Sequence, residues 1–494
     1  MRDTTTAPVD DAPVATGARS RLLVIGLSIV VLTVAVLQTA VVPVLGVIAD
    51  QIGTSMVAVS WAVTANLLAA AAATPLIGRL ADLYRKKYVL LGVLLVVLIG
   101  SVLAATTTSL PLLIFARVLQ AASFALYPIG IAILREELSP DRIVSAMAVL
   151  SGTLGFGGGT GLVVVGLLMA DGADYHRVFW LTTVFTLVVI AIVVFLVPNR
   201  PRTARGTIDW LGAVGLAVGL SSVLLAVSQG TTWGWDSPRT LLSFFGGVLV
   251  LVGWWQWERR CARPLVSTRM LTRRTMLFTN LATIFVGMGL YFAFLGLTQF
   301  VQMAPETAGY GFGASVLQAS VIYLLPGAVT GFLIALVSGR FIDRFGARPV
   351  LIVAAFTGMA GFLLIAFVHA APWQVILANV LANAYISLGY GALPALVVAD
   401  SDPGETGVAT GMNAIARTVG SSTAAAVVAL LLGRTTAAGT PPQSSFVLIF
   451  GLGAVTAVFV IGLIAASKPR PGTPRPAPSD EARYESRAMN HEWG

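Results

Sequence analysis

Long apolar runs alternate with short polar breaks along most of the chain. Gly, Pro and charged residues separate the runs. Nearly every run has about 20 residues or more, the length that a helix needs to cross the hydrocarbon core of a bilayer. The pattern predicts about fourteen membrane helices, at residues 22–49, 57–77, 88–106, 110–134, 142–169, 178–197, 209–229, 240–257, 276–303, 315–338, 349–369, 374–399, 407–432 and 445–466.

Two charged decapeptides lie between apolar runs, GRLADLYRKK at residues 78–87 and GRFIDRFGAR at residues 339–348. Both follow the pattern Gly-Arg-x-x-Asp-x-aromatic-x-x-basic, with the acid at Asp82 and Asp343. The positive-inside rule alone predicts basic residues beside membrane helices, so one copy would carry little information. An Asp at the same place in both copies goes beyond that rule and indicates a duplicated membrane protein.

A second pair of matching signals supports the duplication. Two helices after the first decapeptide the chain reads SPDR at residues 139–142, and two helices after the second it reads DPGE at 402–405. Each offers an N-cap side chain followed by Pro at the first helical position. We therefore predict a cytoplasmic tail at 1–21, a six-helix bundle at 22–197, an inserted helix pair at 198–275, a second six-helix bundle at 276–466 and a disordered cytoplasmic tail at 467–494.

The composition excludes a soluble protein, because 56% of the 494 residues are hydrophobic and 11% are charged, against about 25% charged residues in soluble domains. The net charge of +9 does not indicate nucleic-acid binding, since 26 of the 31 Lys and Arg residues fall in segments predicted to face the cytoplasm. This distribution places both termini inside. Arginine outnumbers lysine 28 to 3, which is typical of a GC-rich bacterial genome.

Few residues could hold a metal or a cofactor. Cys261 is the one cysteine, and the three histidines are far apart in the sequence. No lysine stands in the Gly-x-x-x-x-Gly-Lys pattern that binds nucleotide phosphates. We therefore expect no cofactor and no metal, and no arrangement of nucleophile and base indicates an enzyme.

These motifs resemble those of the major facilitator superfamily. The decapeptide resembles the loop motif between helices 2 and 3 of that family, and Arg117 in LLIFARVLQAASFA looks like its helix-4 arginine. The inserted pair resembles the 14-helix drug:proton antiporter branch, as do Asp209-Trp210-Leu211-Gly212, Trp233-Gly234-Trp235, Glu258-Arg259-Arg260 and Pro264-Leu265. The resemblance implies an all-α polytopic membrane protein with two six-helix bundles, built from inverted repeats, plus two inserted helices.

The resemblance also implies a gate at the cytoplasmic side. Asp82 would contact the start of the helix near Thr406, and Asp343 would contact the start near Asp141, where a helix dipole favours a carboxylate by about 0.3–2 kcal/mol. The alternative is a purely topological or folding role. The predicted gating residues are Asp82, Arg85, Asp343, Arg344, Asp141 and Glu405, with the two arginines orienting the carboxylates.

Polar residues inside predicted helices are candidates for the transport pathway. Arg117 lies several residues inside its helix, where a charge costs a few kcal/mol and therefore suggests a function. In the family fold, helices 1, 4, 9 and 12 of this numbering line a central cavity. The candidates are Arg117, Gln38, Gln120, Tyr127, Tyr291, Gln299, Asn379, Asn383 and Tyr390. For each amide the alternative is an interhelical hydrogen bond worth about 1 kcal/mol.

Two features depart from the antiporter pattern. None of the 22 acidic residues lies in the middle of a predicted helix, and Gln38 stands where the 14-helix antiporters often carry a carboxylate. An amide cannot titrate, and a cavity without a carboxylate disfavours strongly cationic cargo. The fifth helix also lacks the Pro and one Gly of the antiporter motif; the glycines of residues 152–159 are expected to serve close helix packing.

The sequence thus favours a secondary active transporter of the bacterial plasma membrane. It would export hydrophobic small molecules, such as a drug or natural product, by proton antiport with alternating access. The alternatives are a proton-independent facilitator or importer, and a transport-silent membrane binding protein. The expected partners are a small-molecule substrate, the proton gradient and the lipid bilayer, with no nucleic acid, and we expect a monomer.

Overall fold

The computed structural model describes residues 17–41, 44–169, 173–200, 207–262, 264–402, 405–433 and 440–467. Within these ranges all regular structure is helical, and fourteen spans are long and apolar enough to cross a membrane. Each predicted apolar run overlaps one of these spans, which confirms the predicted number and order of membrane helices. Most of the two predicted tails lies outside the described residues.

Most spans are single helices, and two are composite. The single helices are α1 (Ala18–Thr39), α3 (Met56–Leu83), α4 (Lys86–Thr106), α7 (Pro140–Leu168), α8 (His176–Leu196), α9 (Trp210–Trp233), α10 (Pro238–Arg260), α12 (Arg274–Gln302), α16 (Ala347–Phe367), α17 (Pro372–Ala399), α18 (Thr406–Leu432) and α19 (Gln443–Ala466). The composite spans are α5 (Leu110–Gln120) with η2 (Ala121–Ala125) and α6 (Leu126–Glu137), and α14 (Val316–Gln318) with η4 (Ala319–Leu324) and α15 (Leu325–Phe345). The short helices α2 (Leu45–Ile52), α11 (Thr268–Thr272) and α13 (Pro305–Ala308) lie between spans.

Some predicted boundaries are wrong. The first run, 22–49, contains two helices, because α1 ends at Thr39 and α2 begins at Leu45. Helices α3 and α15 continue into the decapeptides instead of ending before them. Their charged last turns keep helical backbone until Tyr84 turns extended and until Gly346 adopts a φ of 84°. A left-handed φ of this kind favours Gly and stops the helix.

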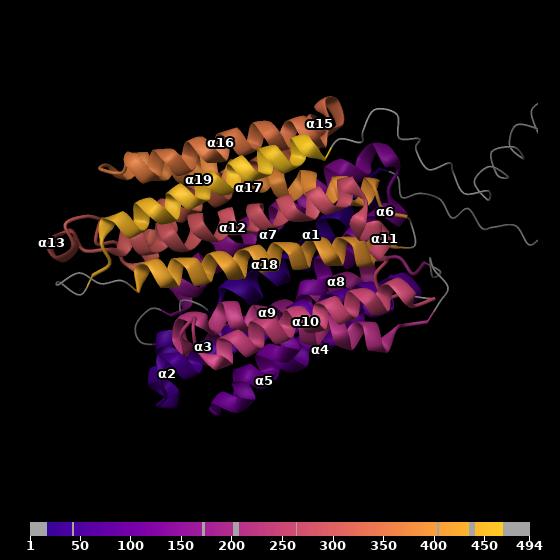
Figure 1. Cartoon of the computed structure of the whole chain (residues 1–494), viewed down its shortest axis with the longest axis horizontal. Helices are drawn as coiled ribbons and strands as arrows, with labels where there is room; N and C mark the ends of the chain where they lie inside the picture. The colour runs from indigo at the N-terminus through magenta and orange to yellow at the C-terminus, as the bar shows by residue number, and fades with distance from the viewer. Residues whose placement is uncertain are drawn as a thin grey trace, which may run out of the picture.

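The spans form two bundles, as Figure 1 shows. Helices α1 and α3–α8 form the N-terminal bundle, with two buried apolar clusters of its own. Helices α12 and α15–α19 form the C-terminal bundle around a third cluster. The bundles meet along two seams, one between α7 and the pair α15 and α17, the other between α18 and the pair α3 and α6.

The inserted pair α9 and α10 lies beside the second seam. Helix α9 packs on both α3 and α18, so it contacts both bundles, and α10 packs mainly on α9. The Oγ of Ser221 donates to the carbonyl oxygen of Leu68 over 3.3 Å, which ties α9 to α3. The pair therefore covers one of the two seams.

Two acids stabilise the inserted pair at the ends of its helices. Asp209 caps α9 by accepting the N–H of Gly212 over 2.9 Å and the indole N–H of Trp257 over 2.8 Å. Glu258 is buried and accepts the indole N–H of Trp254 over 3.0 Å. The motif residues that resemble the 14-helix branch thus join α9 to α10.

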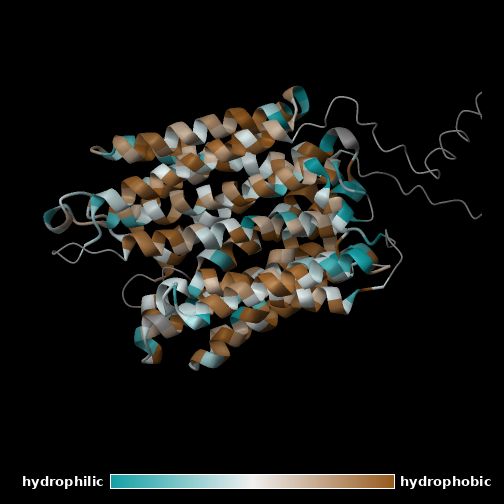
Figure 2. Cartoon of the chain, viewed as in Figure 1, coloured by the Kyte–Doolittle hydropathy of each residue, from teal (hydrophilic) through white to brown (hydrophobic). Residues whose placement is uncertain are grey.

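Hydrophobic residues form a belt along the middle of the helices and hydrophilic residues gather at the helix ends (Figure 2), and many of the large apolar side chains are exposed. Phe195, Leu242, Leu249 and Phe367 are among the most exposed. Large apolar side chains in contact with the surroundings over a whole belt are typical of a protein in lipid. The chain is therefore a multi-pass membrane protein.

Both decapeptides lie at one end of the bundles, which we call the decapeptide end. The two ends of the described chain are found there too. Arg142 at the start of α7 donates to Ser20 Oγ over 3.3 Å, and Arg348 donates to Ser467 Oγ over 3.2 Å. The termini of the described chain therefore share one side of the membrane.

Candidate functional site

At the decapeptide end, Asp82 of α3 contacts the start of α18 in the other bundle. Its Oδ1 accepts the N–H of Gly407 over 3.0 Å and its Oδ2 accepts the N–H of Val408 over 3.1 Å. The Asp82 side chain is buried, with 1% exposed. Helix α18 begins at Thr406, one residue before the predicted 407–432 but beyond the Pro of the DPGE signal, and its N-cap residue Glu405 makes no side-chain cap bond in the described chain. Asp82 therefore supplies the missing cap from the opposite bundle.

Glycines let the bundles come this close at both seams. A Cβ on Gly78 would lie 2.9 Å from the carbonyl oxygen of Gly407, and a Cβ on Gly339 would lie 2.2 Å from Cα of Ser145. Further along the first seam, a Cβ on Gly152 would lie 1.9 Å from Cβ of Ala335. The first Gly of each decapeptide is therefore required for helix contact, and the two copies occupy equivalent positions.

The second decapeptide is less fully described than the first. Asp343 is exposed in α15, and the side chain of its expected partner Asp141 lies outside the described part of the structure. The Arg344 guanidinium lies over the Phe345 ring at 5.3 Å. In the first copy, Arg85 is not seen to orient the Asp82 carboxylate. Because Arg85 follows the end of α3, it is exposed, and the cations that act on Asp82 are Lys86 and Arg79.

Arg135 makes an inter-bundle contact that the sequence did not predict. From the last turn of α6 its guanidinium donates to the carbonyl oxygen of Ser401 over 3.1 Å, to Ser401 Oγ over 3.2 Å and to Thr406 Oγ1. These acceptors belong to the connection between α17 and α18. Arg135 and Asp82 thus hold the same connection of the C-terminal bundle from two helices of the N-terminal bundle.

This connection also carries acids with altered pKa values. Burial raises the pKa of Asp400, although the charges of Arg273 and Arg348 oppose the shift. Burial and the nearby charge of Asp402 raise the pKa of Glu405. These two carboxyl groups therefore take up protons at a higher pH than ordinary surface carboxylates.

A cavity lies between the bundles, away from the decapeptide end, with about 1060 Å³ of empty space. Its walls come from α1, α3, η2, α7, α12, η4, α15, α17 and α18, so both bundles contribute. The cavity thus has more contributing helices than the four that the resemblance implied. Its lining is mainly apolar with polar side chains grouped on one part of the wall, as expected for a small-molecule site.

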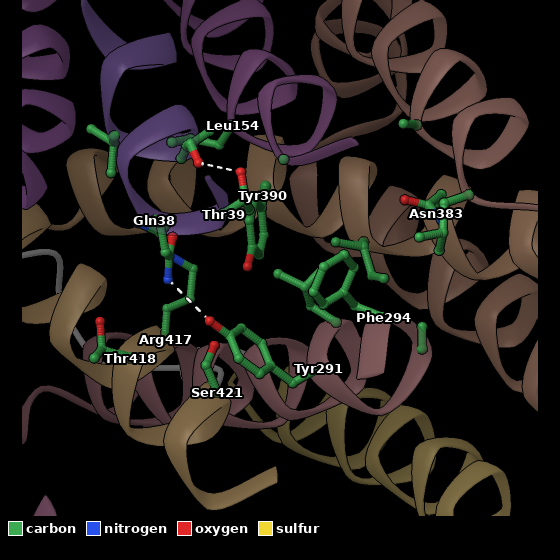
Figure 3. Close-up of a pocket in the computed structure, with 18 of the residues that line it drawn as sticks. Gln38, Thr39, Leu154, Tyr291, Phe294, Asn383, Tyr390, Arg417, Thr418 and Ser421 are labelled. Carbon is green, nitrogen blue, oxygen red and sulfur yellow. Dashed lines mark hydrogen bonds between the residues drawn. The ribbon is translucent and has the colours of Figure 1, made fainter. Parts of the chain in front are cut away.

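Five of the predicted pathway residues line this cavity: Gln38, Tyr291, Asn379, Asn383 and Tyr390. The Nε2 of Gln38 in α1 donates to the hydroxyl of Tyr291 in α12 over 3.1 Å, a contact between the two bundles (Figure 3). Gln38 therefore faces the cavity, where a carboxylate would be if this chain had one.

Asn379 and Asn383 line the cavity, and each also makes hydrogen bonds within the C-terminal bundle. The bond of Asn379 joins two helices, which is the alternative role considered for these amides. The Nδ2 of Asn379 donates to the carbonyl oxygen of Tyr323 over 2.8 Å, and the Nδ2 of Asn383 donates to Asn379 Oδ1 over 2.8 Å. Tyr323 belongs to η4, a π-helical turn that precedes Pro326. Such turns free backbone carbonyls and are frequent at functional sites. Asn379 satisfies one of these carbonyls at the cavity wall.

Arg117 and Gln120 are not on the cavity wall. Arg117 is 1% exposed and lies within the N-terminal bundle. Its guanidinium donates to the carbonyl oxygens of Leu37 over 3.2 Å and Ala62 over 3.3 Å, and to Gln120 Oε1 over 2.6 Å. Gln120 in turn donates to Ser101 Oγ over 2.9 Å. This network ties α5 to α1, α3 and α4. Arg117 therefore joins helices of the N-terminal bundle in this structure.

Two other candidates lie elsewhere. Tyr127 of α6 is buried just behind the cavity wall, with its hydroxyl 2.8 Å from Ser151 Oγ. Gln299 is exposed on α12 and does not line the cavity. Neither position excludes contact with a substrate in another conformation, so their role in a pathway stays a prediction.

Arg417 of α18 was not among the pathway residues predicted from the sequence. It lines the cavity, and its guanidinium carbon lies 4.9 Å from the ring centres of both Tyr127 and Tyr390. Figure 3 shows it on the same part of the wall as Gln38 and Tyr291. A single charge in the middle of a predicted membrane helix was the signal that could have found it.

Comparisons with known proteins agree with this architecture. The sequence model of the Major Facilitator Superfamily matches residues 27–425 and 292–491. A solved structure of a proton:xylose symporter of that superfamily superposes with a TM-score of 0.61 over 90% of this chain and 95% of its own, at 13% identity. At that identity the likeness supports the fold alone.

The relatives found by sequence similarity differ in the functions that their names state. An uncharacterized MFS-type transporter of Mycobacterium tuberculosis is 31% identical over 85% of this chain, and the match spans 61% of that relative's length. A uridine/deoxyuridine transporter of Lactococcus lactis is 28% identical over 65% of this chain and 68% of its own. A tetracenomycin C resistance and export protein of Streptomyces glaucescens is 27% identical over 78% of this chain and 71% of its own.

Proposed function

This chain belongs to the Major Facilitator Superfamily, and on that premise we propose that it exports hydrophobic small molecules as a member of the 14-helix drug:proton antiporter branch. It is a transporter rather than an enzyme. The observation that carries the proposal is a largely apolar cavity of about 1060 Å³ lined by both bundles. A mainly apolar lining with a few polar side chains is typical of sites that bind hydrophobic small molecules.

The transport mechanism that we propose is alternating access. Asp82 and Arg135 hold the bundles together at the decapeptide end through hydrogen bonds to the α17–α18 connection. Each contact at a helix terminus is worth about 0.3–2 kcal/mol, so it can break and reform in each cycle. Rocking of the bundles would then open the cavity at the decapeptide end, which we propose faces the cytoplasm of a bacterial cell.

The direction of transport is supported by relatives with export functions in their names. The Streptomyces relative is an antibiotic resistance and export protein, and a Bacillus subtilis relative is called multidrug resistance protein 3. The inserted pair α9 and α10, with Asp209 as the cap of α9 and Glu258 buried near the end of α10, fits the 14-helix branch. The uridine/deoxyuridine transporter favours nucleosides as a second candidate cargo.

Proton coupling requires a group that titrates during the cycle. The described lining of the cavity has Gln38 and Arg417 but no Asp or Glu. We propose that the proton is instead taken up at the decapeptide end by Asp400 or Glu405, whose pKa values are raised by burial. Opening of the gate would expose these carboxyl groups to water and lower their proton affinity. A proton-independent facilitator is the second mechanism that the lining permits.

Uptake of fluorescent hydrophobic dyes into everted vesicles tests this function. Vesicles with the protein should accumulate at least one dye of a broad panel, and a protonophore should abolish the accumulation. Vesicles without the protein are the control. Uptake that survives the protonophore would favour the facilitator, and a panel handled alike with and without the protein would contradict transport of this class.

A further inference from the structure

Arg417 places a positive charge in the wall of the central cavity. Its guanidinium is held between the rings of Tyr127 and Tyr390, each at 4.9 Å. Tyr127 comes from the N-terminal bundle, whereas Tyr390 and Arg417 come from the C-terminal bundle. Both rings attract the guanidinium by cation–π contact and hold its charge at this part of the cavity wall.

The Arg417 charge has no acidic partner among the described residues. Each ion pair that the structure gives lies elsewhere, and the described cavity lining contains neither Asp nor Glu. Cation–π contacts compensate only about 1–2 kcal/mol each. The stacked rings also leave the N–H groups at the guanidinium edge without carboxylate acceptors. A half-buried cation of this kind is suited to an anion brought by the ligand.

Neutral hydrogen-bonding groups surround the charge. The hydroxyls of Tyr291 and Tyr390, both on the cavity wall, lie within range of the positive charge of Arg417. Gln38 donates to Tyr291, and Figure 3 shows Ser421 near the same hydroxyl. Hydroxyl and amide groups can donate to an anion without adding a charge of their own. This part of the wall thus offers several donors around one fixed cation.

Apart from Asn379 and Asn383, the rest of the lining is mainly apolar. Val34, Leu67 and Phe124 line it from the N-terminal bundle, and Leu290, Phe294 and Ile386 line it from the C-terminal bundle. A small ion bound at Arg417 alone would leave these apolar side chains without a contact. The lining therefore matches a molecule with one anionic group on a larger apolar frame.

We propose that the cavity selects amphipathic organic anions, with a carboxylate or acidic phenolate bound by Arg417 and the apolar frame lying against the opposite wall. The inference deepens the proposed function, since it rests on this cavity being the substrate site. Cations of the same shape are disfavoured, because they would meet the guanidinium at short range with no acid to balance it.

A different account would make Arg417 only a clamp between the bundles. In that case its removal would loosen the structure but would not change how the cavity discriminates between charges. Ligands that share one frame and differ in charge separate the two accounts. We therefore choose 1-pyrenebutyrate, the neutral 1-pyrenebutanol and the cation 4-(1-pyrenyl)butylammonium as probes.

The experiment measures binding of each probe to the purified full-length chain in lipid nanodiscs, with empty nanodiscs subtracted. The parent protein should bind pyrenebutyrate about 10- to 100-fold more tightly than either other probe, the range expected for hydrogen bonds to a charged group. Arg417→Gln should abolish this preference, and Arg417→Lys should retain part of it. Arg239→Gln is the matched control, because it removes the same charge from an exposed position on α10.

The inference is overturned if the parent binds the three probes equally, if it fails to bind pyrenebutyrate, or if Arg417→Gln keeps the full preference for the anion. Vesicle transport of the same probes separates this result from the proposed function. Transport of neutral or cationic probes with no dependence on Arg417 would leave the transporter intact and refute anion selection. Arg417-dependent binding without transport of any probe would support the anion site and contradict the exporter.

Discussion

Replacing Asp82 with Asn should open the decapeptide end. The carboxylate now accepts two backbone N–H groups at the start of α18, at 3.0 and 3.1 Å, from a buried position. Asn has one acceptor oxygen, and its NH2 group would face the second N–H donor. The variant thus loses one hydrogen bond and the charge that favours a helix N-terminus.

The expected loss is about 2–3 kcal/mol, from the bond to a charged group and the helix-terminus term together. At 1.4 kcal/mol per factor of ten, the ratio of open to closed protein should rise roughly 30- to 140-fold. The change is large enough to measure even if the parent opens rarely.

Cysteine labelling can measure this ratio. Ala148 of α7 is buried at the first seam, between the cavity and the decapeptide end. In a background with Cys261→Ser, Ala148→Cys reports whether an impermeant maleimide can pass between the bundles. Addition of Asp82→Asn should accelerate labelling at the face that carries the decapeptides, and not at the opposite face.

Asp50→Asn is the matched control, because Asp50 is an exposed acid on α2. It should leave the labelling rate unchanged. If Asp82→Asn labels at the parent rate in correctly inserted protein, then the Asp82 contact does not hold this end closed, and the reasoning from its geometry is refuted.

Arg135→Ala should accelerate the same labelling about tenfold or more, because hydrogen bonds to a charged donor are worth about 1.5–3 kcal/mol. Gly152→Leu should abolish transport and keep the decapeptide end open to the maleimide, since even a Cβ would lie 1.9 Å from Cβ of Ala335. Arg117→Gln should lower the melting temperature in detergent, with about 1–3 kcal/mol lost for each buried acceptor left unpaired, but should not alter the preference between anionic and cationic probes. Gln38→Asp should make binding of pyrenebutyrate weaken as pH rises, because a carboxylate in the cavity wall would ionise near the bound anion.

Each of these outcomes has a contrary result. Labelling of Arg135→Ala at the parent rate would contradict its gating contact, and normal transport by Gly152→Leu would contradict close approach at the first seam. Gly92→Ala is the control for added volume, since a Cβ there meets no other atom within 4 Å. A changed charge preference in Arg117→Gln would contradict the assignment of the ligand to this cavity. Binding by Gln38→Asp that does not vary with pH would contradict it too.

The sequence predicted the membrane spans well, because an apolar run of sufficient length determines a span almost regardless of its neighbours. Helix ends were less predictable. Residues 78–83 and 339–345 are polar and were expected to be loops, yet they complete the last turns of α3 and α15. The break between α1 and α2 was hidden, because the residues on both sides of it are equally apolar.

The contact of Asp82 with α18 was implied by the family resemblance, and two signals in the sequence agreed with it: a repeated acid and a helix start in the other half. Arg135 offered no such signal, since a basic residue at a helix end is what the positive-inside rule predicts anyway. Its role depends on the position of Ser401 and Thr406, which are more than 260 residues away in sequence.

The two membrane arginines illustrate the limit of sequence reasoning. Arg117 attracted attention through its resemblance to a family motif, yet backbone carbonyls and Gln120 satisfy it inside one bundle. Arg417 lay in an unremarked run of small residues, and only the fold brings it between Tyr127 and Tyr390. Which buried charge faces the cavity depends on helix rotation, and the apolar pattern does not specify that rotation.

Alternating access is the central claim, and a reversible crosslink tests it most directly. A Cβ on Gly391 of α17 would lie 3.3 Å from Cβ of Ala148 in α7, close to the separation of about 3.5–4.5 Å in disulfides. With Cys261→Ser as background, Ala148→Cys with Gly391→Cys should join the bundles on oxidation. Transport of the dye accumulated by the parent should stop on oxidation and return with dithiothreitol, while each single variant transports under both conditions. Undiminished transport by the fully crosslinked protein would contradict the account.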